Sequence, residues 1–370
     1  MKILSVFGTR PEAVKMAPIV NLLAQTAGVE SRVCVTAQHR QMLDQVLNLF
    51  EIKPDYDLDL MRDDQSLAQL SANICTHLDP VLADFNPDWV LAVGDTTTVV
   101  TTSLLAFYRR IKFGHVEAGL RTHNKWHPFP EEINRRLATV TADLHFAPTE
   151  WSQGNLLREG VDPKTIVVTG NSVIDALKFV SKQAEPKETK DILAKLGTKK
   201  IILVTAHRRE NFGVPLENIC HALKELAYRG DIEIVYPVHL NPNVQEPVYK
   251  LLKGVEHITL LPPLDYLPLV HLMKHATLIL TDSGGIQEEA PAFGIPTLVL
   301  RDVTERPEGV DAGTLKLVGT EANFIVQQVA RLLESESAYA EMAKAVNPYG
   351  DGHTAEKIIQ SLLKPDGGGG

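Results

Sequence analysis

The chain has 370 residues, of which 44% are hydrophobic, and its formal net charge is −9 with histidine neutral. This length suits two domains of ~150–200 residues better than one. The acidic balance argues against a nucleic-acid-binding protein, which normally presents a basic surface, and the three widely spaced cysteines exclude a disulfide framework or a zinc pattern.

The first half of the chain alternates short apolar runs with amphipathic patterns. Strands are predicted at Ile3–Phe7, Ser31–Thr36, Trp89–Val93, Lys112–Val116, Leu144–Phe146 and Ile166–Val168. Helices are predicted between them at Ala13–Gln25, Met42–Leu49, Leu67–Leu82 and Thr97–Tyr108. This alternation of strands and helices is typical of βαβ units around a parallel sheet.

The second half repeats the same alternation. Its predicted strands are Lys200–Thr205, Glu233–Pro237, Ile258–Leu260, Leu278–Leu280 and Thr297–Leu300. Its predicted helices are Leu216–Tyr228, Asn243–Leu252, Leu267–Lys274, Gly285–Phe293 and Glu321–Glu334. The sequence therefore predicts an α/β fold of two Rossmann-like, doubly wound domains that face one another across a cleft, where the carboxyl ends of their strands bind ligands.

The charged segment Lys182–Thr198 is the least apolar stretch between the halves, which predicts the inter-domain connection near Gly170–Lys200. We expect an N-terminal domain at 1–170 and a C-terminal domain at 171–350. The helical pattern Thr354–Leu363 predicts a C-terminal helix within 351–366, with packing on the first domain left open, and 367–370 resemble a tag or a disordered tail. No apolar run reaches the ~18–20 residues that span a bilayer, and no signal peptide precedes the first strand, so we expect a cytoplasmic protein without a membrane partner.

Positive charge follows the first predicted strand. In the segment FGTRPEAVKMAP, Arg10 precedes a proline that suits the first turn of a helix, and Lys15 lies about one turn further on. Both side chains are candidate phosphate contacts, and for Arg10 a functional role is favoured over a structural one. Glu12 fits a simpler role, since an acidic side chain stabilises a helix N-terminus.

Carboxylates follow three successive strand–loop junctions. Asp95 lies in VGDTTT at the end of a strand, Glu117 lies in GHVEAGLRT, and Glu131 starts a helix in PFPEEINRR. Like charges brought together over one sheet edge raise at least one pKa, which suits proton transfer. The alternative is that each carboxylate caps a helix, and the residues alone leave both interpretations open.

A Ser-Gly-Gly turn follows the strand at 278–280. In TDSGGIQEEAP, Ser283, Gly284 and Gly285 lead into a helix whose first N–H groups lack intrahelical partners. A diphosphate fits such a turn, and Glu288 or Glu289 is placed to accept hydrogen bonds from a ribose. An ordinary strand–helix turn with a capping serine is an equally good interpretation.

Further cations follow other strands of the second half. His207 and Arg208 lie in VTAHRREN, His239 in YPVHLNPN and Arg306 in RDVTERPE. A cationic cluster at the ends of strands suits a phosphate-bearing ligand. Metal-ligand spacings, a Walker motif, a nucleophile elbow and a dinucleotide fingerprint are missing from the sequence, so no metal and no cofactor is predicted.

Taken in order, these motifs resemble those of the bacterial non-hydrolysing UDP-N-acetylglucosamine 2-epimerases, a family of glycosyltransferase-B architecture. The segments that carry the resemblance include FGTRPEAVKMAP, TAQHRQMLDQ, GDTTT, GHVEAGLRT, PEEINRR, TAHRREN, HLNPN, TDSGGIQEEAP and DVTERPE. They occur in the family's order and cover nearly the whole chain. The resemblance rests on the ordered set rather than on any single motif.

The resemblance implies interconversion of UDP-N-acetylglucosamine and UDP-N-acetylmannosamine, which supplies surface polysaccharide synthesis. UDP is eliminated to give a 2-acetamidoglucal and is then added back with carbon 2 inverted, without a cofactor. The implied catalytic residues are Asp95, Glu117, Glu131 and His207. The implied contacts to substrate or UDP are Arg10, Lys15, His207, Ser283, Gly284, Gly285, Glu289 and Arg306.

The resemblance also implies an activating UDP-N-acetylglucosamine and a homodimer. The matching activator positions are Gln38, Gln41, Gln65, Arg208 and His239. Asp64 departs from the family pattern, because some members carry a basic residue there. The alternatives are a glycosyltransferase of the same architecture that uses a UDP-sugar, a hydrolase that releases UDP, and a sensor that binds a UDP-sugar without catalysis.

Overall fold

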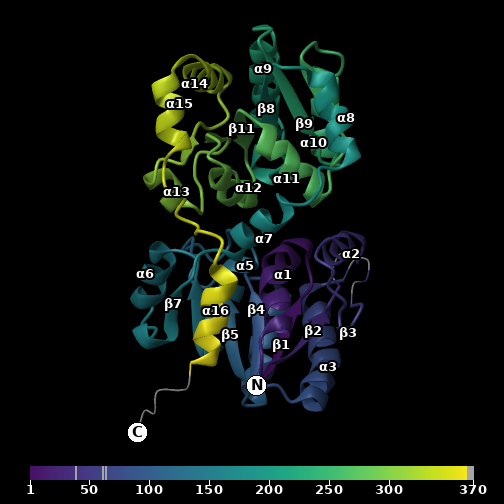
Figure 1. The fold of residues 1–370 in the computed structure, drawn as a ribbon, viewed down its shortest axis with the longest axis vertical. Helices are drawn as coiled ribbons and strands as arrows, with labels where there is room; N and C mark the ends of the chain where they lie inside the picture. Colours follow the sequence, from purple (N-terminus) through teal and green to yellow (C-terminus); the bar gives the residue numbers. More distant parts are fainter. Residues whose placement is uncertain (38–39, 61, 63–64, 365–370) are drawn as a thin grey trace. The chain divides into compact units, whose positions relative to one another are not determined.

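The computed structural model describes residues 1–37, 40–60, 62 and 65–364, and it divides into two compact units (Figure 1). Unit 1 contains Met1–Ala176 and the chain from Tyr349 onward, and unit 2 contains Leu177–Pro348. Each unit has one sheet of parallel strands with helices interleaved along the sequence. The predicted α/β fold with two Rossmann-like sheets is confirmed.

The sheet of unit 1 has seven strands in the order β3-β2-β1-β4-β5-β6-β7. They are β1 (Lys2–Phe7), β2 (Glu30–Val35), β3 (Tyr56–Asp57), β4 (Trp89–Val93), β5 (Lys112–Val116), β6 (Leu144–Ala147) and β7 (Ile166–Val168). The strand order reverses between β1 and β4, and such a switch point is where open parallel sheets bind ligands. All five residues of β4 are buried, as expected for a central strand that helices cover on both faces.

The helices of unit 1 begin at local sequence signals. Thr9 caps the first of them and forms a capping box with Glu12, and Ser66 forms the corresponding box with Gln69. The helices are α1 (Arg10–Gln25), α2 (Arg40–Leu49), α3 (Leu67–Phe85), α4 (Thr97–Tyr108), α5 (Glu131–Thr141), α6 (Glu150–Arg158) and α16 (Thr354–Leu363), while α7 (Ser172–Val180) crosses into unit 2. The C-terminal α16 packs against α1, and Asp175 accepts hydrogen bonds from its first two amides, Thr354 N and Ala355 N.

The sheet of unit 2 has six strands in the order β10-β9-β8-β11-β12-β13. They are β8 (Lys200–Thr205), β9 (Ile232–Pro237), β10 (Ile258–Leu261), β11 (Leu278–Thr281), β12 (Thr297–Val299) and β13 (Leu315–Leu317). The helices are α8 (Lys187–Leu196), α9 (Val214–Ala227), α10 (Pro242–Leu252), α11 (Tyr266–His275), α12 (Gly284–Glu289), α13 (Pro307–Asp311), α14 (Ala322–Glu334) and α15 (Glu336–Ala343). The switch point of this sheet lies between β8 and β11.

One helix was not predicted, and one predicted helix has wrong bounds. The segment expected to connect the domains contains α8, whose buried Thr189, Ile192 and Leu196 recur at helical spacing beneath its charged residues. The helix expected at Gly285–Phe293 ends at Glu289 and continues as a 3₁₀ turn around Pro291, which lacks the N–H that an α-helix needs.

Two kinds of feature are absent from the described residues. In that part of the chain no helix has the length and apolarity needed to cross a bilayer. Nor do its histidine, cysteine, aspartate and glutamate side chains form a group of three or more that is arranged to hold a metal ion.

Candidate active site

The loop after β1 is held by hydrogen bonds to one buried carboxylate, that of Glu12. Glu12 accepts hydrogen bonds from Gly8 N at 3.0 Å, Thr9 N at 2.7 Å and the Thr96 hydroxyl at 2.6 Å. Burial raises the pKa of Glu12, against the lowering effect of these hydrogen bonds. A side chain on Gly8 would place its Cβ 1.9 Å from Thr36 Oγ1, so only glycine fits. Glu12 therefore has the structural role expected from the sequence, and it links the ends of β1 and β4.

Glu117, at the end of β5, is held by two side chains from other parts of unit 1. Lys15 forms an ion pair with it, and Asn171 Nδ2 donates to the same oxygen at 3.1 Å. The backbone of Glu117 has a φ of +62°, a conformation that costs free energy for any residue with a side chain. Strain of this kind at the end of a central strand is typical of functional sites. Lys15, which the sequence predicts as a phosphate contact, thus also holds this carboxylate in an ion pair.

Asp95 follows the neighbouring strand, β4, and it does not cap a helix. The N-cap of α4 is Thr96, whose hydroxyl accepts from Val99 N. The carboxylate of Asp95 instead accepts from Arg135 Nη2 at 2.6 Å, and its main-chain oxygen accepts from Asn134 Nδ2 at 3.0 Å. The capping alternative is thereby excluded for Asp95. β4 and β5 pair in register, so the loops that carry Asp95 and Glu117 leave the same edge of the sheet.

The two glutamates at the start of α5 differ in burial. Glu132 is fully buried, where it accepts from Thr122 N and His123 N and lies 3.6 Å from Arg135 Nη1. Its role is to hold the loop before α5. Glu131, the predicted catalytic residue, is half-buried and is the first residue of the helix, whose N-cap Pro130 offers no side-chain hydrogen bond.

His115 was missed by the sequence analysis because a single histidine inside a strand has no distinctive pattern. It is fully buried, and its Nε2 lies 2.7 Å from the carbonyl oxygen of Gly94, the residue before Asp95. Since a carbonyl only accepts, Nε2 carries the proton. The pKa of His115 is lowered to about 4, chiefly by burial and also by the charges of nearby His145 and Arg121, against the raising effect of the hydrogen bond to Gly94. The neutral ring thus fixes the turn that presents Asp95.

We expect this histidine to make folding stability depend on pH. Its pKa is lower in the folded chain than the ordinary 6.5, so its contribution is complete above pH 6.5 and is lost as the pH falls towards 4. The wild type should lose about 2–3 kcal/mol more unfolding free energy between pH 7 and pH 4.5 than His115→Gln, which does not titrate. Urea unfolding at both pH values measures this difference. Equal losses in the two proteins would contradict the buried neutral state of His115.

The switch point of unit 2 is organised by a buried aspartate. Asp282 has no exposed surface, and its carboxylate accepts from His207 N at 2.8 Å, Arg208 N at 2.8 Å and Asn211 Nδ2 at 2.9 Å. These contacts fix the loop after β8 against the end of β11. The sequence analysis quoted Asp282 but gave it no role, because its three donors lie 71–75 residues earlier in the chain.

The predicted histidines of unit 2 lie together. The rings of His207 and His239 stack with centroids 5.3 Å apart and planes 15° from parallel. His207 Nδ1 also lies 3.7 Å from the Asp282 carboxylate. The side chain of His207 is partly exposed while its backbone is held, which suits a group that meets a ligand.

The hydroxyl of Ser283, in the turn after β11, does not cap the helix that follows. Ser283 is the N-cap of α12 but makes no side-chain cap bond. Arg306 lies beside the turn, since a Cβ on Gly284 would be 3.2 Å from the guanidinium carbon, and Arg306 Nη2 pairs with Glu288 at 2.8 Å. Glycine at this position therefore allows the cation to approach the first amides of α12. Glu289, the predicted ribose contact, is buried in α12.

The remaining predicted site residues have fewer described contacts, and some of them lie outside the described part of the chain. Arg10 is the first residue of α1 and, within the described chain, its side chain forms no ion pair. Gln65 precedes α3, and its Nε2 is buried. Gln38, Asp64 and the side chain of Gln41 lie outside the described residues.

Comparisons with known proteins agree on one family. The UDP-N-acetylglucosamine 2-epimerase family model matches residues 21–363. A Yersinia pestis protein named UDP-N-acetylglucosamine 2-epimerase is 58% identical over 371 residues, which cover 98% of each chain. The structure of the Neisseria meningitidis UDP-GlcNAc 2-epimerase bound to UDP-GlcNAc is 51% identical, with a TM-score of 0.92, over 99% of this chain and 100% of that one.

A further solved structure points the same way. A structure from S. aureus in complex with UDP is 49% identical, with a TM-score of 0.88, over 98% of this chain and 95% of that one. The sequence match and the structural match both extend over nearly the full length of the relatives. This chain belongs to the UDP-N-acetylglucosamine 2-epimerase family.

Proposed function

We propose that the protein is the enzyme that interconverts UDP-N-acetylglucosamine and UDP-N-acetylmannosamine. The family membership supports this proposal, as do the relatives solved with UDP-GlcNAc and with UDP. The observation that carries it is the pair of carboxylates at the ends of β4 and β5, Asp95 and Glu117, each held by its own cation, Arg135 and Lys15. Inversion at carbon 2 needs such acid–base groups, whereas simple sugar binding does not.

The proposed reaction has two steps. In the first, a carboxylate takes the proton from carbon 2, the bond between carbon 1 and the UDP oxygen breaks, and 2-acetamidoglucal and UDP form. In the second, UDP adds back to carbon 1 while a protonated group delivers a proton to the opposite face of carbon 2. Asp95, Glu117 and Glu131 are the proposed acid–base groups, and the reaction consumes no redox equivalent.

Unit 2 supplies the proposed UDP contacts. The Ser283 hydroxyl and the first amides of α12 are suited to phosphate oxygens, and His207 and Arg306 add positive charge. Glu289 is the proposed ribose ligand. From unit 1 we propose Arg10 as a further phosphate contact and Lys15 as the group that positions Glu117.

Incubation with UDP-N-acetylglucosamine in deuterium oxide tests the proposal. The epimerase is expected to place deuterium at carbon 2 in both epimers, which NMR and mass spectrometry detect. Release of UDP without the second epimer would identify a hydrolase, and sugar transfer that depends on an acceptor would identify a glycosyltransferase. Ligand binding without turnover would identify a sensor. Any of these three outcomes would overturn the proposal.

The finer parts of the family resemblance belong to the same proposal. We propose a cytoplasmic location, supply of surface polysaccharide synthesis, and an activating UDP-N-acetylglucosamine contacted by Gln38, Gln41, Gln65, Arg208 and His239.

We also propose a homodimer, and an exposed apolar surface on unit 1 supports it. Large apolar side chains recur at spacings of three and four residues on α4 and α5, which pack against each other. They are Leu104, Phe107, Tyr108, Ile133, Leu137 and Val140, and Val140 is 83% exposed. A surface of this kind marks an interaction site.

Leu137→Glu is therefore expected to convert the protein from dimer to monomer, because it puts a charge into the apolar surface of α4 and α5. Sedimentation velocity measures the change. Val346→Glu is the matched control, since Val346 is also 83% exposed but lies in unit 2. A monomeric wild type, or a Leu137→Glu protein that sediments as the wild type does, would contradict this assignment.

A further inference from the structure

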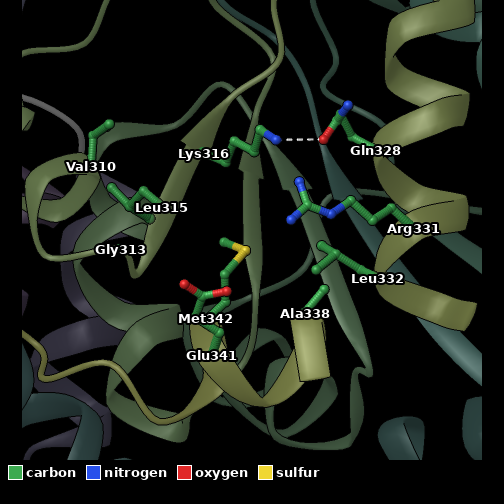
Figure 2. Close-up of a pocket in the computed structure, with 10 residues that line it drawn as sticks. All are labelled: Val310, Gly313, Leu315, Lys316, Gln328, Arg331, Leu332, Ala338, Glu341 and Met342. Carbon is green, nitrogen blue, oxygen red and sulfur yellow. Dashed lines mark hydrogen bonds between the residues drawn. The ribbon is translucent and has the colours of Figure 1, made fainter. Parts of the chain in front are cut away.

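A cavity of about 300 Å³ lies in unit 2, and no residue placed in the candidate active site is among those that line it (Figure 2). Its walls come from the edge strand β13, from α14 and α15, and from the segment that includes α13. The volume is at the lower end of the range for small-molecule sites, which is roughly 300–1,000 Å³. The lining residues are Val310, Gly313, Leu315, Lys316, Gln328, Arg331, Leu332, Ala338, Glu341 and Met342.

Helical spacing explains why these side chains converge. On α14, Gln328, Arg331 and Leu332 are three and four residues apart and so share one face. On α15, Ala338, Glu341 and Met342 have the same spacing. Figure 2 shows the Arg331 guanidinium and the Met342 sulfur pointing into the space between the two helices and β13.

Two cations lie at one end of this cavity. Lys316 on β13 donates to Gln328 Oε1 at 2.5 Å, and Gln328 is itself buried. Within the described chain neither Lys316 nor Arg331 forms an ion pair. Burial lowers the pKa of Lys316, and the charge of Arg331 lowers it further. The two like charges repel one another, so an anion bound between them gains two favourable interactions.

The rest of the cavity is apolar apart from one carboxylate. Leu315, Leu332 and Ala338 are buried, and Met342 is a flexible side chain that adapts to a ligand. Glu341 lies beside Met342, at the end of the view away from Lys316 (Figure 2). A second negative charge on a ligand would be repelled there. The cavity thus combines a cationic end with an apolar body.

We propose that this cavity is a further ligand site, distinct from the proposed substrate and activator sites, which binds a small organic monoanion whose carboxylate meets Lys316 and Arg331 and whose apolar body contacts Leu332 and Met342. The site shares no residue with the proposed UDP contacts. Its ligand is a molecule such as an aryl or short-chain alkyl carboxylate rather than a nucleotide, which is too large and carries too many charges for the cavity.

The test uses 3-phenylpropionate as the probe and the Met342 methyl group as the reporter. The full chain is labelled with ¹³C at its six methionine methyl groups and titrated with the probe. A saturable shift of the Met342 signal is expected at millimolar concentration. The uncharged 3-phenylpropan-1-ol should bind about tenfold more weakly or worse, because it forms no charge-assisted hydrogen bond.

Matched variants complete the test. Lys316→Gln and Arg331→Gln should each weaken 3-phenylpropionate binding about tenfold, and Lys250→Gln, at an exposed site on α10, should not change it. Unshifted signals of the other methionines show that each variant is folded. The proposal is overturned if the Met342 signal does not saturate, if the alcohol binds as well as the carboxylate, or if both cation variants bind the probe as the wild type does.

Discussion

Asp95→Asn is expected to lower kcat by about a hundredfold or more, the usual contribution of an acid–base group. The substitution keeps the size of the side chain and an oxygen that accepts from Arg135 Nη2, but it removes the ability to exchange a proton at neutral pH. Steady-state turnover of UDP-N-acetylglucosamine measures the loss. Deuterium incorporation at carbon 2 should fall in parallel, because proton transfer is the step affected.

Two further substitutions make this result interpretable. Glu131→Gln should show a loss of similar size if Glu131 serves as an acid–base group, whereas Asp191→Asn, on an exposed position of α8, should leave kcat unchanged. UDP affinity should change much less than kcat in Asp95→Asn, since the proposed UDP contacts lie elsewhere. A near-normal kcat in both Asp95→Asn and Glu131→Gln would remove these carboxylates from the mechanism.

The sequence predicts those elements of the fold that have a recognisable local pattern of residues. β4 is a run of five apolar residues followed by a Gly-Asp pair, and the sequence predicts both the strand and the place of Asp95 just after it. β3 has only two residues, which is too short for any periodicity to be visible, and the three residues of β13 include the charged Lys316, so they form no apolar run. α8 was missed because its charged residues outnumber the three that it buries.

The residues of the candidate site also fall into those that a local sequence pattern predicts and those that it does not. Asp95 and Glu117 are recognisable because each follows an apolar run, but their partners Arg135 and Asn171 lie 40 and 54 residues further along the chain. Such pairings depend on which strands become neighbours in the sheet. The structure excludes the capping role for Asp95, because it assigns the cap to Thr96, and the acid–base role of Asp95 stays a proposal.

Asp282→Ala is expected to have the largest effect on unit 2. It would leave His207 N, Arg208 N and Asn211 Nδ2 without their buried acceptor, and each unsatisfied donor costs about 1–3 kcal/mol. We expect a loss of unfolding free energy of about 3 kcal/mol or more, and a weaker affinity for UDP because the His207 loop is no longer held. Urea unfolding and calorimetric titration with UDP measure the two effects.

Asp282→Asn separates the hydrogen-bonding role of this residue from its charge. With its amide oxygen in the place of Oδ2, asparagine still accepts from His207 N, Arg208 N and Asn211 Nδ2. Its NH₂ group takes the place of Oδ1, near His207 Nδ1, and loses only the longer hydrogen bond from His207 N at 3.1 Å. The loss of stability should therefore be clearly smaller than in Asp282→Ala. If the alanine and asparagine variants lost equal stability, the negative charge would be the decisive feature of Asp282. If neither variant weakened UDP binding, the His207 loop would have no part in holding the nucleotide.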